Sequence, residues 1–519
     1  MINATLSWVS CRIAIGLTLF ILFALHLTAT GDDWPRFRGV NGSGVAAGGE
    51  NLSPSWRAMD HLQWKVALPG PGASSPIIVG QRVFVTCYSG YGVTKKESSP
   101  IEDLTRHLLC FDLKGGELLW EYAVAAVLPE DSYYKSGVSS HGYASHTPCS
   151  DGKFVYCFFG KGGVFAFSLD GQLVWTAEVG SGSDPPRWGS SSSPVLCGDV
   201  LIVTAAAESR CIIGFDKSSG RRLWTTPASG LDGMWGTPAI AKDQNGLENL
   251  VMMVPGEIWA MNPLRGTLIR YAEATESRQA YTSLVVKGSE IFGFSGEGSG
   301  SLSLQLSGVG DISEAGDSWR GMVGATYASP ILHQSKLYVV SRGVLSVVDA
   351  RTGERVQQLR LKNSRIIGNT RFGSLDYASP VLVGNRLLSI NASGQLYVLR
   401  LGERVTIESV SEISEQGEVF WGTPALSDQG LIIRGSKHLH YLTLSGPADQ
   451  SAGEASVSDA ELKNAVSTTK LARQGTQYID ADQVRSHWKQ FSRESPKVPQ
   501  VIPQRPSNVI PQRPSNVVP

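Results

Sequence analysis

The chain lacks a charge excess of either sign. Its 519 residues include 46 Lys and Arg and 46 Asp and Glu, so the formal net charge is zero. A nucleic-acid-binding protein needs a basic field to attract phosphate groups. The balance of charge therefore argues against nucleic acid as a partner.

Cysteine is scarce, and no two cysteines are adjacent or arranged as C-x-x-C. The sequence thus gives no support for a zinc site or for thioredoxin-like chemistry. One of the seven cysteines, Cys11, lies in the apolar N-terminal region. In an exported chain the other six can pair as disulfides, or they can serve as small hydrophobic side chains in strands. These six are Cys87, Cys110, Cys149, Cys157, Cys197 and Cys211.

Long hydrophobic runs are also lacking, with one exception near the N-terminus. Arg12 precedes an apolar stretch from Ile13 to Leu27, and small residues follow up to Gly31. This pattern predicts a secretory signal over residues 1–31 and hence a periplasmic or secreted protein. An uncleaved anchor is the alternative, although the stretch is shorter than the roughly 20 residues of a membrane-spanning helix. No span is expected in the mature chain.

A short pattern that ends in proline recurs along the chain. The sequences "SSSP", "WGTP", "YASP", "YASP" and "WGTP" end at Pro194, Pro238, Pro330, Pro380 and Pro424. Similar prolines follow small residues at positions 76 and 148, and a leucine at position 284 fills one gap. The spacing is 44 to 50 residues, apart from a first step of 72. The chain therefore contains eight related units.

Each unit contains up to four short apolar runs separated by turns, and the chain is rich in glycine, with 57 residues. Four short strands at this period indicate a propeller blade. We therefore predict an all-β, eight-bladed propeller of four-stranded antiparallel blades over residues 32–445. The last unit has only three strand-like runs, whereas an unused run, "LQWKVAL" at residues 62–68, precedes the first unit. This run is predicted to complete the last blade and close the ring.

Aromatic residues stand three positions before the proline in five units, whereas Ala73, Ser145 and Ser191 occupy this position in the first three. If the register holds, the aromatic rings lie around part of the channel mouth. They either face a ligand or wedge between neighbouring blades, where ring area is buried. The five residues are Trp235, Tyr281, Tyr327, Tyr377 and Trp421.

The first unit is longer than the others because of two insertions, residues 89–107 and 125–142. Long loops on a rigid scaffold often carry function. Strand order places both insertions on the same rim as the aromatic positions, so they are predicted to add to a binding surface there. Candidate residues in or next to them are Asp103, Arg106, Tyr133, Tyr134, His141 and Tyr143.

The composition changes after residue 445. Residues 446–519 begin as a linker and end in two copies of an eight-residue unit, VIPQRPSN, at 501–508 and 509–516. Proline and polar residues at this density predict an extended, polyproline-like and disordered tail. Such a tail can contact a protein or cell-envelope partner, or act as a passive spacer.

A motif in several units carries a family resemblance. "CFDLKGGELLW" (residues 110–120) and "GFDKSSGRRLW" (residues 214–224) fit the pattern A-x-D-x-x-x-G-x-x-x-W except at the first position, and "VVDARTGERVQ" (residues 347–357) loses the tryptophan. The chain resembles the pyrroloquinoline-quinone (PQQ)-like repeat propellers, in which this motif locks blades together. The segment "DDWPRFRGVNGSG" (residues 32–44) is also similar to secreted propellers of planctomycete-type bacteria.

The resemblance implies two kinds of function. The scaffold lipoprotein of the outer-membrane assembly machine has this fold and catalyses nothing, whereas quinoprotein dehydrogenases hold PQQ and calcium on the propeller axis. In those enzymes the resemblance implies adjacent cysteines and a carboxylate-rich calcium site, and this sequence has no adjacent cysteines and no recognisable calcium spacing. Only Arg187, Arg342 and Arg371 suggest a basic pocket for PQQ.

We therefore predict an exported, non-catalytic propeller that binds or scaffolds. No catalytic residue, metal site or cofactor is predicted. The alternatives are a PQQ-dependent dehydrogenase with calcium, and a propeller that binds a glycan or a peptide through its aromatic rim.

Overall fold

The structure is a computed structural model of the chain. It describes residues 33–444, apart from gaps at 47–51, 53–55, 94–98, 133–142, 275–276, 295–299, 326, 362–375, 414–416 and 429, and residues 476–479. The predicted signal, residues 1–31, and most of the predicted tail lie outside the described residues. Within them, no helix is long and apolar enough to cross a membrane.

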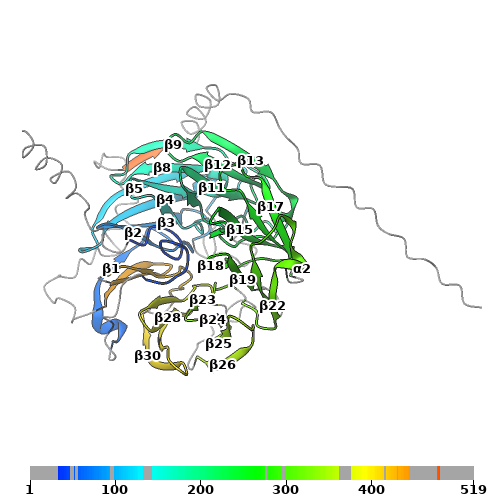
Figure 1. Ribbon diagram of the computed structural model, residues 1–519. Helices are drawn as coiled ribbons and strands as arrows, with labels where there is room; N and C mark the ends of the chain where they lie inside the picture. Colours follow the sequence, from blue (N-terminus) through cyan, green and yellow to red (C-terminus); the bar gives the residue numbers. More distant parts are fainter. Residues whose placement is uncertain are drawn as a thin grey trace, which may run out of the picture.

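Eight antiparallel sheets are arranged around a common centre (Figure 1). The predicted eight-bladed propeller is thus confirmed. From the innermost strand outwards, the first four blades are β2(Ile77–Val79), β3(Arg82–Ser89), β4(Thr105–Asp112) and β5(Leu118–Ala125); β6(Cys149–Ser150), β7(Phe154–Phe158), β8(Val164–Ser168) and β9(Leu173–Ala177); β10(Val195–Cys197), β11(Val200–Ala205), β12(Cys211–Asp216) and β13(Arg222–Pro227); and β14(Ala239–Lys242), β15(Glu248–Val254), β16(Glu257–Met261) and β17(Leu268–Glu273).

The other four blades follow the same order. They are β18(Val285–Lys287), β19(Glu290–Phe294), β20(Ser301–Gln305) and β22(Asp317–Gly321); β23(Ile331–His333), β24(Lys336–Ser341), β25(Val344–Asp349) and β26(Arg355–Arg360); β27(Val381–Val383), β28(Arg386–Ile390), β29(Gln395–Arg400) and β30(Thr406–Glu412); and β31(Ala425–Leu426), β32(Gly430–Arg434), β33(His438–Thr443) and β1(Leu62–Ala67).

A few short elements decorate the blades. Two extra strands run parallel to outermost strands: β21(Gly310–Asp311) beside β17, and β34(Thr476–Ile479) beside β5. The described helices are single turns: η1(Ala58–His61), η2(Ile101–Asp103), η4(Gly160–Gly162), η5(Ser229–Leu231) and α2(Ser313–Gly316).

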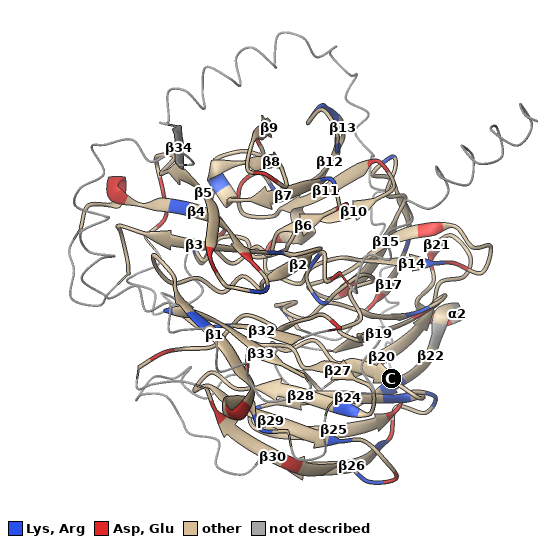
Figure 2. Ribbon diagram, turned by 90° about the vertical axis from the view of Figure 1, so that its left-hand side faces the viewer, with Lys and Arg blue, Asp and Glu red and all other residues tan. Residues whose placement is uncertain are grey.

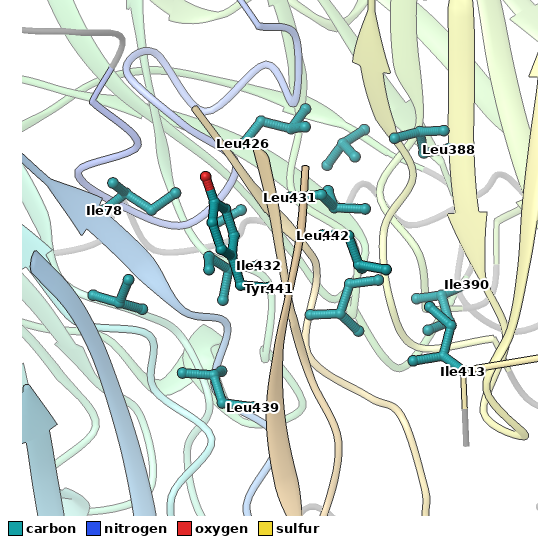
Figure 3. Close-up of a cluster of buried hydrophobic side chains, with 14 of the residues drawn as sticks. Ile78, Leu388, Ile390, Ile413, Leu426, Leu431, Ile432, Leu439, Tyr441 and Leu442 are labelled. Carbon is teal, nitrogen blue, oxygen red and sulfur yellow. The ribbon is translucent and has the colours of Figure 1, made fainter. Parts of the chain in front are cut away.

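The ring closes as the sequence predicts. Strand β1 pairs antiparallel with β33, so a strand from the N-terminal side completes the last blade. Leu431, Ile432 and Leu442 of that blade pack in one buried cluster with Ile78 of the first blade and Leu388 of the seventh (Figure 3). Because this cluster spans three blades, burial of its apolar surface holds the two ends of the ring together.

Tryptophans on outermost strands lock neighbouring blades. The indole Nε1 of Trp120 donates a hydrogen bond to the carbonyl of Leu169 in the next blade, at 2.9 Å. Its ring lies on Gly171, which has a φ of +86° and where a Cβ atom would stand 2.7 Å from the indole. Only glycine suits both the backbone conformation and the close approach. The same bond to the next blade is made by Trp64, Trp175 and Trp319.

The unit that loses the motif tryptophan uses an amide instead. The side-chain nitrogen of Gln357 donates to the carbonyl of Val405 in the next blade, at 2.9 Å, and its oxygen accepts from the Val405 N–H, at 2.8 Å. Sequence comparison of the motif does not reveal this replacement, because the partner is a backbone group in another blade.

A ring of hydroxyl groups joins the innermost strands. In every unit the residue before the motif proline, or before the leucine that replaces it, is Ser or Thr, and in seven units its oxygen accepts a hydrogen bond of 2.9–3.0 Å from the corresponding backbone N–H of the preceding blade. The bond from Thr423 N–H to Ser75 Oγ closes the ring. Ser283 Oγ is buried and makes no hydrogen bond to the described residues. The small residues before the motif prolines are therefore inter-blade acceptors.

The segment before β1 crosses the centre of the ring. Trp34 forms a β-bridge with Ile78 of the first blade, and Val45 forms one with Leu382 of the seventh. Arg38, which is buried, donates to the carbonyl of Pro330 at the start of the sixth. Because these innermost strands lie on different sides of the centre, residues 33–46 must pass across it.

The six described cysteines are free thiols, and five of them are buried. Burial raises the pKa of Cys87 and of Cys149 to about 12. They thus pack as small apolar side chains, one of the two alternatives from sequence. Lys and Arg are interspersed with Asp and Glu along the ribbon, and neither sign gathers on the side seen in Figure 2.

Candidate functional site

The predicted aromatic residues lie on one face of the ring. Each stands in the link between the outermost strand of one blade and the innermost strand of the next. In a meandering four-stranded blade, these links share a face with the connections between the second and third strands. We refer to this side of the ring as the link face.

The five rings form a continuous series of ring contacts across neighbouring blades, which we call the aromatic arc. Ring centroids are 5.1 Å apart for Trp235 and Tyr281, 4.7 Å for Tyr281 and Tyr327, 4.3 Å for Tyr327 and Tyr377, and 4.5 Å for Tyr377 and Trp421. Contacts between residues about 45 positions apart show that the proposed register is correct.

Trp188 extends the arc by one ring, and sequence reasoning missed it. Its centroid lies 5.4 Å from that of Trp235. Trp188 stands six positions before its motif proline, and Ser191 occupies the expected position. A search for any aromatic residue in the link, rather than at a fixed offset, would have found it.

The arrangement of the rings determines which parts of the arc are exposed. Trp235 is buried, at 9% exposed, whereas the other five rings of the arc are half-buried. Two of the five contacts are stacked, with interplanar angles of 19° and 24°, and the other three are tilted by 32° to 57°. Burial raises the pKa of Tyr377, and the nearby Tyr327 adds to this shift. The rings therefore join neighbouring blades, as the wedging alternative predicts, and they form a partly exposed surface. That this surface faces a ligand stays a prediction.

A buried polar network lies at the Trp188 end of the arc. Asp184 accepts hydrogen bonds from the backbone N–H groups of Trp188, at 3.2 Å, and Gly189, at 2.8 Å. Trp235 Nε1 in turn donates to the Gly189 carbonyl, at 2.8 Å. The Asp184 carboxylate therefore fixes the link that positions the first two rings of the arc.

Glu208 lies directly behind this link. Ser190 Oγ donates to Glu208 Oε1, at 2.7 Å, and contacts His146 Nε2, at 3.1 Å. Glu208 is 4% exposed, and burial raises its pKa to about 7, although the Ser190 hydrogen bond opposes the shift. His146 is also buried in this network.

A buried ion pair between Lys161 and Asp131 supports the same region. Lys161 Nζ lies 3.0 Å from Asp131 Oδ2 and donates to the hydroxyl of Ser183, also at 3.0 Å. Ser183 Oγ donates to the same carboxylate, at 2.6 Å. This pair joins the second insertion of the first unit to the second blade and to its link.

The candidate residues in the insertions have different positions. Arg106 is 3% exposed and makes two hydrogen bonds to the Glu130 carboxylate, at 2.7 and 2.9 Å. Tyr143 is also buried, and its hydroxyl donates to the Asp131 carbonyl, at 2.7 Å. Asp103 is exposed at the end of η2. Tyr133, Tyr134 and His141 lie outside the described residues. The structure thus brings Arg106 and Tyr143 together, with the arginine carbon 5.5 Å from the ring centre, inside the loop.

The residues suggested for a PQQ pocket do not converge. Arg187 and Arg342 are exposed turn residues in separate blades, with φ angles of 56° and 53°, and Arg371 lies outside the described residues. In the described part of the chain, no three His, Cys, Asp or Glu side chains gather as a metal site would require. Arg187 and Arg342 therefore do not form one pocket.

The sequence matches the profile of a known protein family. The profile of the family described as outer membrane protein assembly factor BamB matches residues 45–182 and 105–359, which together span well over half of the chain. The chain belongs to this family. A comparison with curated proteins finds no match.

Solved structures share the architecture at low sequence identity. Quinohemoprotein alcohol dehydrogenase from Comamonas testosteroni is 12% identical, with a TM-score of 0.56 and 82% of each chain covered. The related enzyme ADHIIG from Pseudomonas putida HK5 is 10% identical, with a TM-score of 0.53 and coverage of 80% of this chain and 81% of that one. BamB from Moraxella catarrhalis is 13% identical, with a TM-score of 0.48 and coverage of 73% and 99%. At such identities the likeness concerns the fold alone.

Proposed function

We propose that this member of the BamB family is an exported, non-catalytic binding propeller that holds a polypeptide segment against the aromatic arc. The observation that carries the proposal is the arc itself. Six rings from six consecutive links contact one another on one face, and five of them are half-buried. Tyr and Trp are the residues that most often dominate the energy of protein interfaces.

The geometry favours a peptide over a glycan. A sugar ring binds by lying on the face of an aromatic ring, but in Trp235, Tyr281, Tyr327 and Tyr377 one face is covered by a stacked neighbour at 5.1 or 4.3 Å. Ring edges and phenol hydroxyls suit an extended peptide. Its side chains can insert between neighbouring rings, and its backbone carbonyl groups can accept hydrogen bonds from the hydroxyls.

An envelope location agrees with this proposal. The apolar segment near the N-terminus predicts export, and the family takes its description from outer membrane protein assembly. A partner in the cell envelope is therefore the natural class to test, and PQQ oxidation is not part of the proposal.

The proposal can be tested with a random dodecapeptide library displayed on phage. The library is panned against the full chain and counter-selected against the Tyr327→Ala variant. We expect enriched peptides to bind the wild-type chain at least tenfold more tightly than this variant. The Tyr271→Ala variant, which removes a half-buried tyrosine from the outermost strand β17, serves as a matched control. Enriched peptides that bind all three chains equally would refute the proposal.

A further inference from the structure

We propose that the aromatic arc binds the proline-rich repeat at the C-terminus of the same chain. This inference rests on the proposed function and names its first ligand. The repeat contains Pro-x-x-Pro twice, at Pro503 and Pro506 and again at Pro511 and Pro514. Sequences of this kind favour the polyproline II helix and dock on aromatic-lined surfaces at a low entropic cost.

The spacing of the rings matches the spacing of the prolines. A polyproline II helix rises about 3.1 Å per residue, so prolines three positions apart lie about 9 Å apart on one side of the helix. The centroid steps from Tyr281 to Tyr327 and from Tyr327 to Tyr377 are 4.7 and 4.3 Å. Two prolines of one repeat can therefore meet alternate rings of the arc.

The topology brings the tail to the correct face. Strand β34 pairs in parallel with β5, in a register that sets Thr476 opposite Glu121 and Ile479 opposite Val124. Strand β5 runs towards the link face, because the link from the first to the second blade follows Ala125. The chain therefore leaves β34 in the direction of the arc.

The connecting segment is long enough to reach the arc. The repeat begins 22 positions after Ile479, and an extended chain of this length spans up to about 75 Å. A compact domain of about 410 residues has a radius of gyration of roughly 22 Å. A tether of this kind raises the local concentration of the repeat to the millimolar range.

Charge is compatible with this contact. Each repeat carries one arginine, Arg505 or Arg513, and no acidic residue follows Glu494. A guanidinium group near tyrosine or tryptophan rings gains cation–π attraction. The repeat thus combines the two side-chain types that an aromatic surface attracts, proline and arginine.

The test uses a fluorescein-labelled peptide with the sequence of residues 501–519 and the full-length chain. In one variant the four prolines of the Pro-x-x-Pro motifs are replaced by alanine, which removes the competing ligand within the chain. With a millimolar local concentration and a peptide dissociation constant of about 0.1 mM, the peptide should bind this variant about tenfold more tightly than the wild type. Fluorescence polarisation gives both affinities.

Two further measurements locate the contact. Adding Tyr327→Ala to the proline variant should abolish peptide binding, whereas adding Tyr271→Ala should leave it unchanged. Because Tyr327→Ala can weaken the fold, a peptide with a photoreactive residue in place of Gln504 is also crosslinked to the proline variant, and the products should map to the links that carry the arc.

The outcomes separate this inference from the proposed function. Equal peptide affinity for the wild type and the proline variant, or crosslinks outside the arc, would overturn it. If this peptide fails to bind while library peptides require Tyr327, the arc binds other segments and only the self-docking inference fails. If neither binds at the arc, both fail.

Discussion

Replacement of Glu208 by glutamine tests the buried network behind the aromatic arc. The side chain keeps its shape, and its oxygen can still accept the hydrogen bond from Ser190. The change removes only the ability to ionise. Its effect on stability should therefore depend on pH in a way that a simple packing defect would not.

The sign follows from the pKa of the carboxyl group. Burial raises the pKa of Glu208 from 4.5 to about 7 in the folded chain. Below pH 4.5 the group is protonated in both folded and unfolded chains, so ionisation costs nothing. As the pH rises from 4.5 to 7, the folded chain keeps a proton that the unfolded chain releases, and the wild type loses stability. Above pH 7 the loss is complete.

The magnitude follows from the same shift. One pKa unit corresponds to about 1.4 kcal/mol, so the wild type should lose on the order of 3 kcal/mol relative to Glu208→Gln between pH 4.5 and 7. His440 acts in the opposite direction, since burial lowers its pKa from 6.5 to about 4 and stability falls as the pH drops through this range. Because both chains contain His440, its contribution cancels in the difference.

The assay is denaturant unfolding of both chains at intervals from pH 4.5 to 8.5. Glu418→Gln is the matched control, because the hydrogen bonds from His438 and nearby backbone N–H groups outweigh the effect of burial and lower the pKa of Glu418. That variant should lose stability relative to the wild type above pH 4.5. A stability difference between Glu208→Gln and wild type that stays constant over this pH range would refute the reasoning.

Three further predictions concern the contacts between blades. Trp120→Phe should cost about 1 kcal/mol more than Trp224→Phe in chemical unfolding, since the indole N–H of Trp120 makes a hydrogen bond to the next blade and that of Trp224 makes none to the described residues. Ser329→Ala should cost about 1–3 kcal/mol because it leaves a buried N–H unsatisfied, whereas Ser283→Ala should be nearly neutral; equal costs would contradict the hydroxyl ring. Gln357→Leu should lower the melting temperature, and Gln357→Glu, which keeps the acceptor, should lower it less.

Much of the fold could be predicted from the sequence because a propeller is built from local repeats. The motif proline and the glycine turns recur at a nearly constant period, and each unit folds mainly against itself and its neighbours. The number of blades, the completion of the last blade by residues 62–68 and the register of the aromatic positions could therefore all be predicted.

The tertiary structure alone decided which side chains meet across the ring. Trp188 joins the arc and Glu208 is buried behind Ser190, although neither stands at a repeated position. Gln357 stands at the motif tryptophan position, but only the structure shows that its amide takes over the contact with the next blade. Aligning the units by their repeat period identifies equivalent positions. A contact between blades, however, depends on the path of each individual link. The burial of a side chain and its effect on the pKa depend on the same paths. The sequence by itself therefore determined the number and order of the blades, whereas the folded links determined the aromatic arc and the buried network behind it.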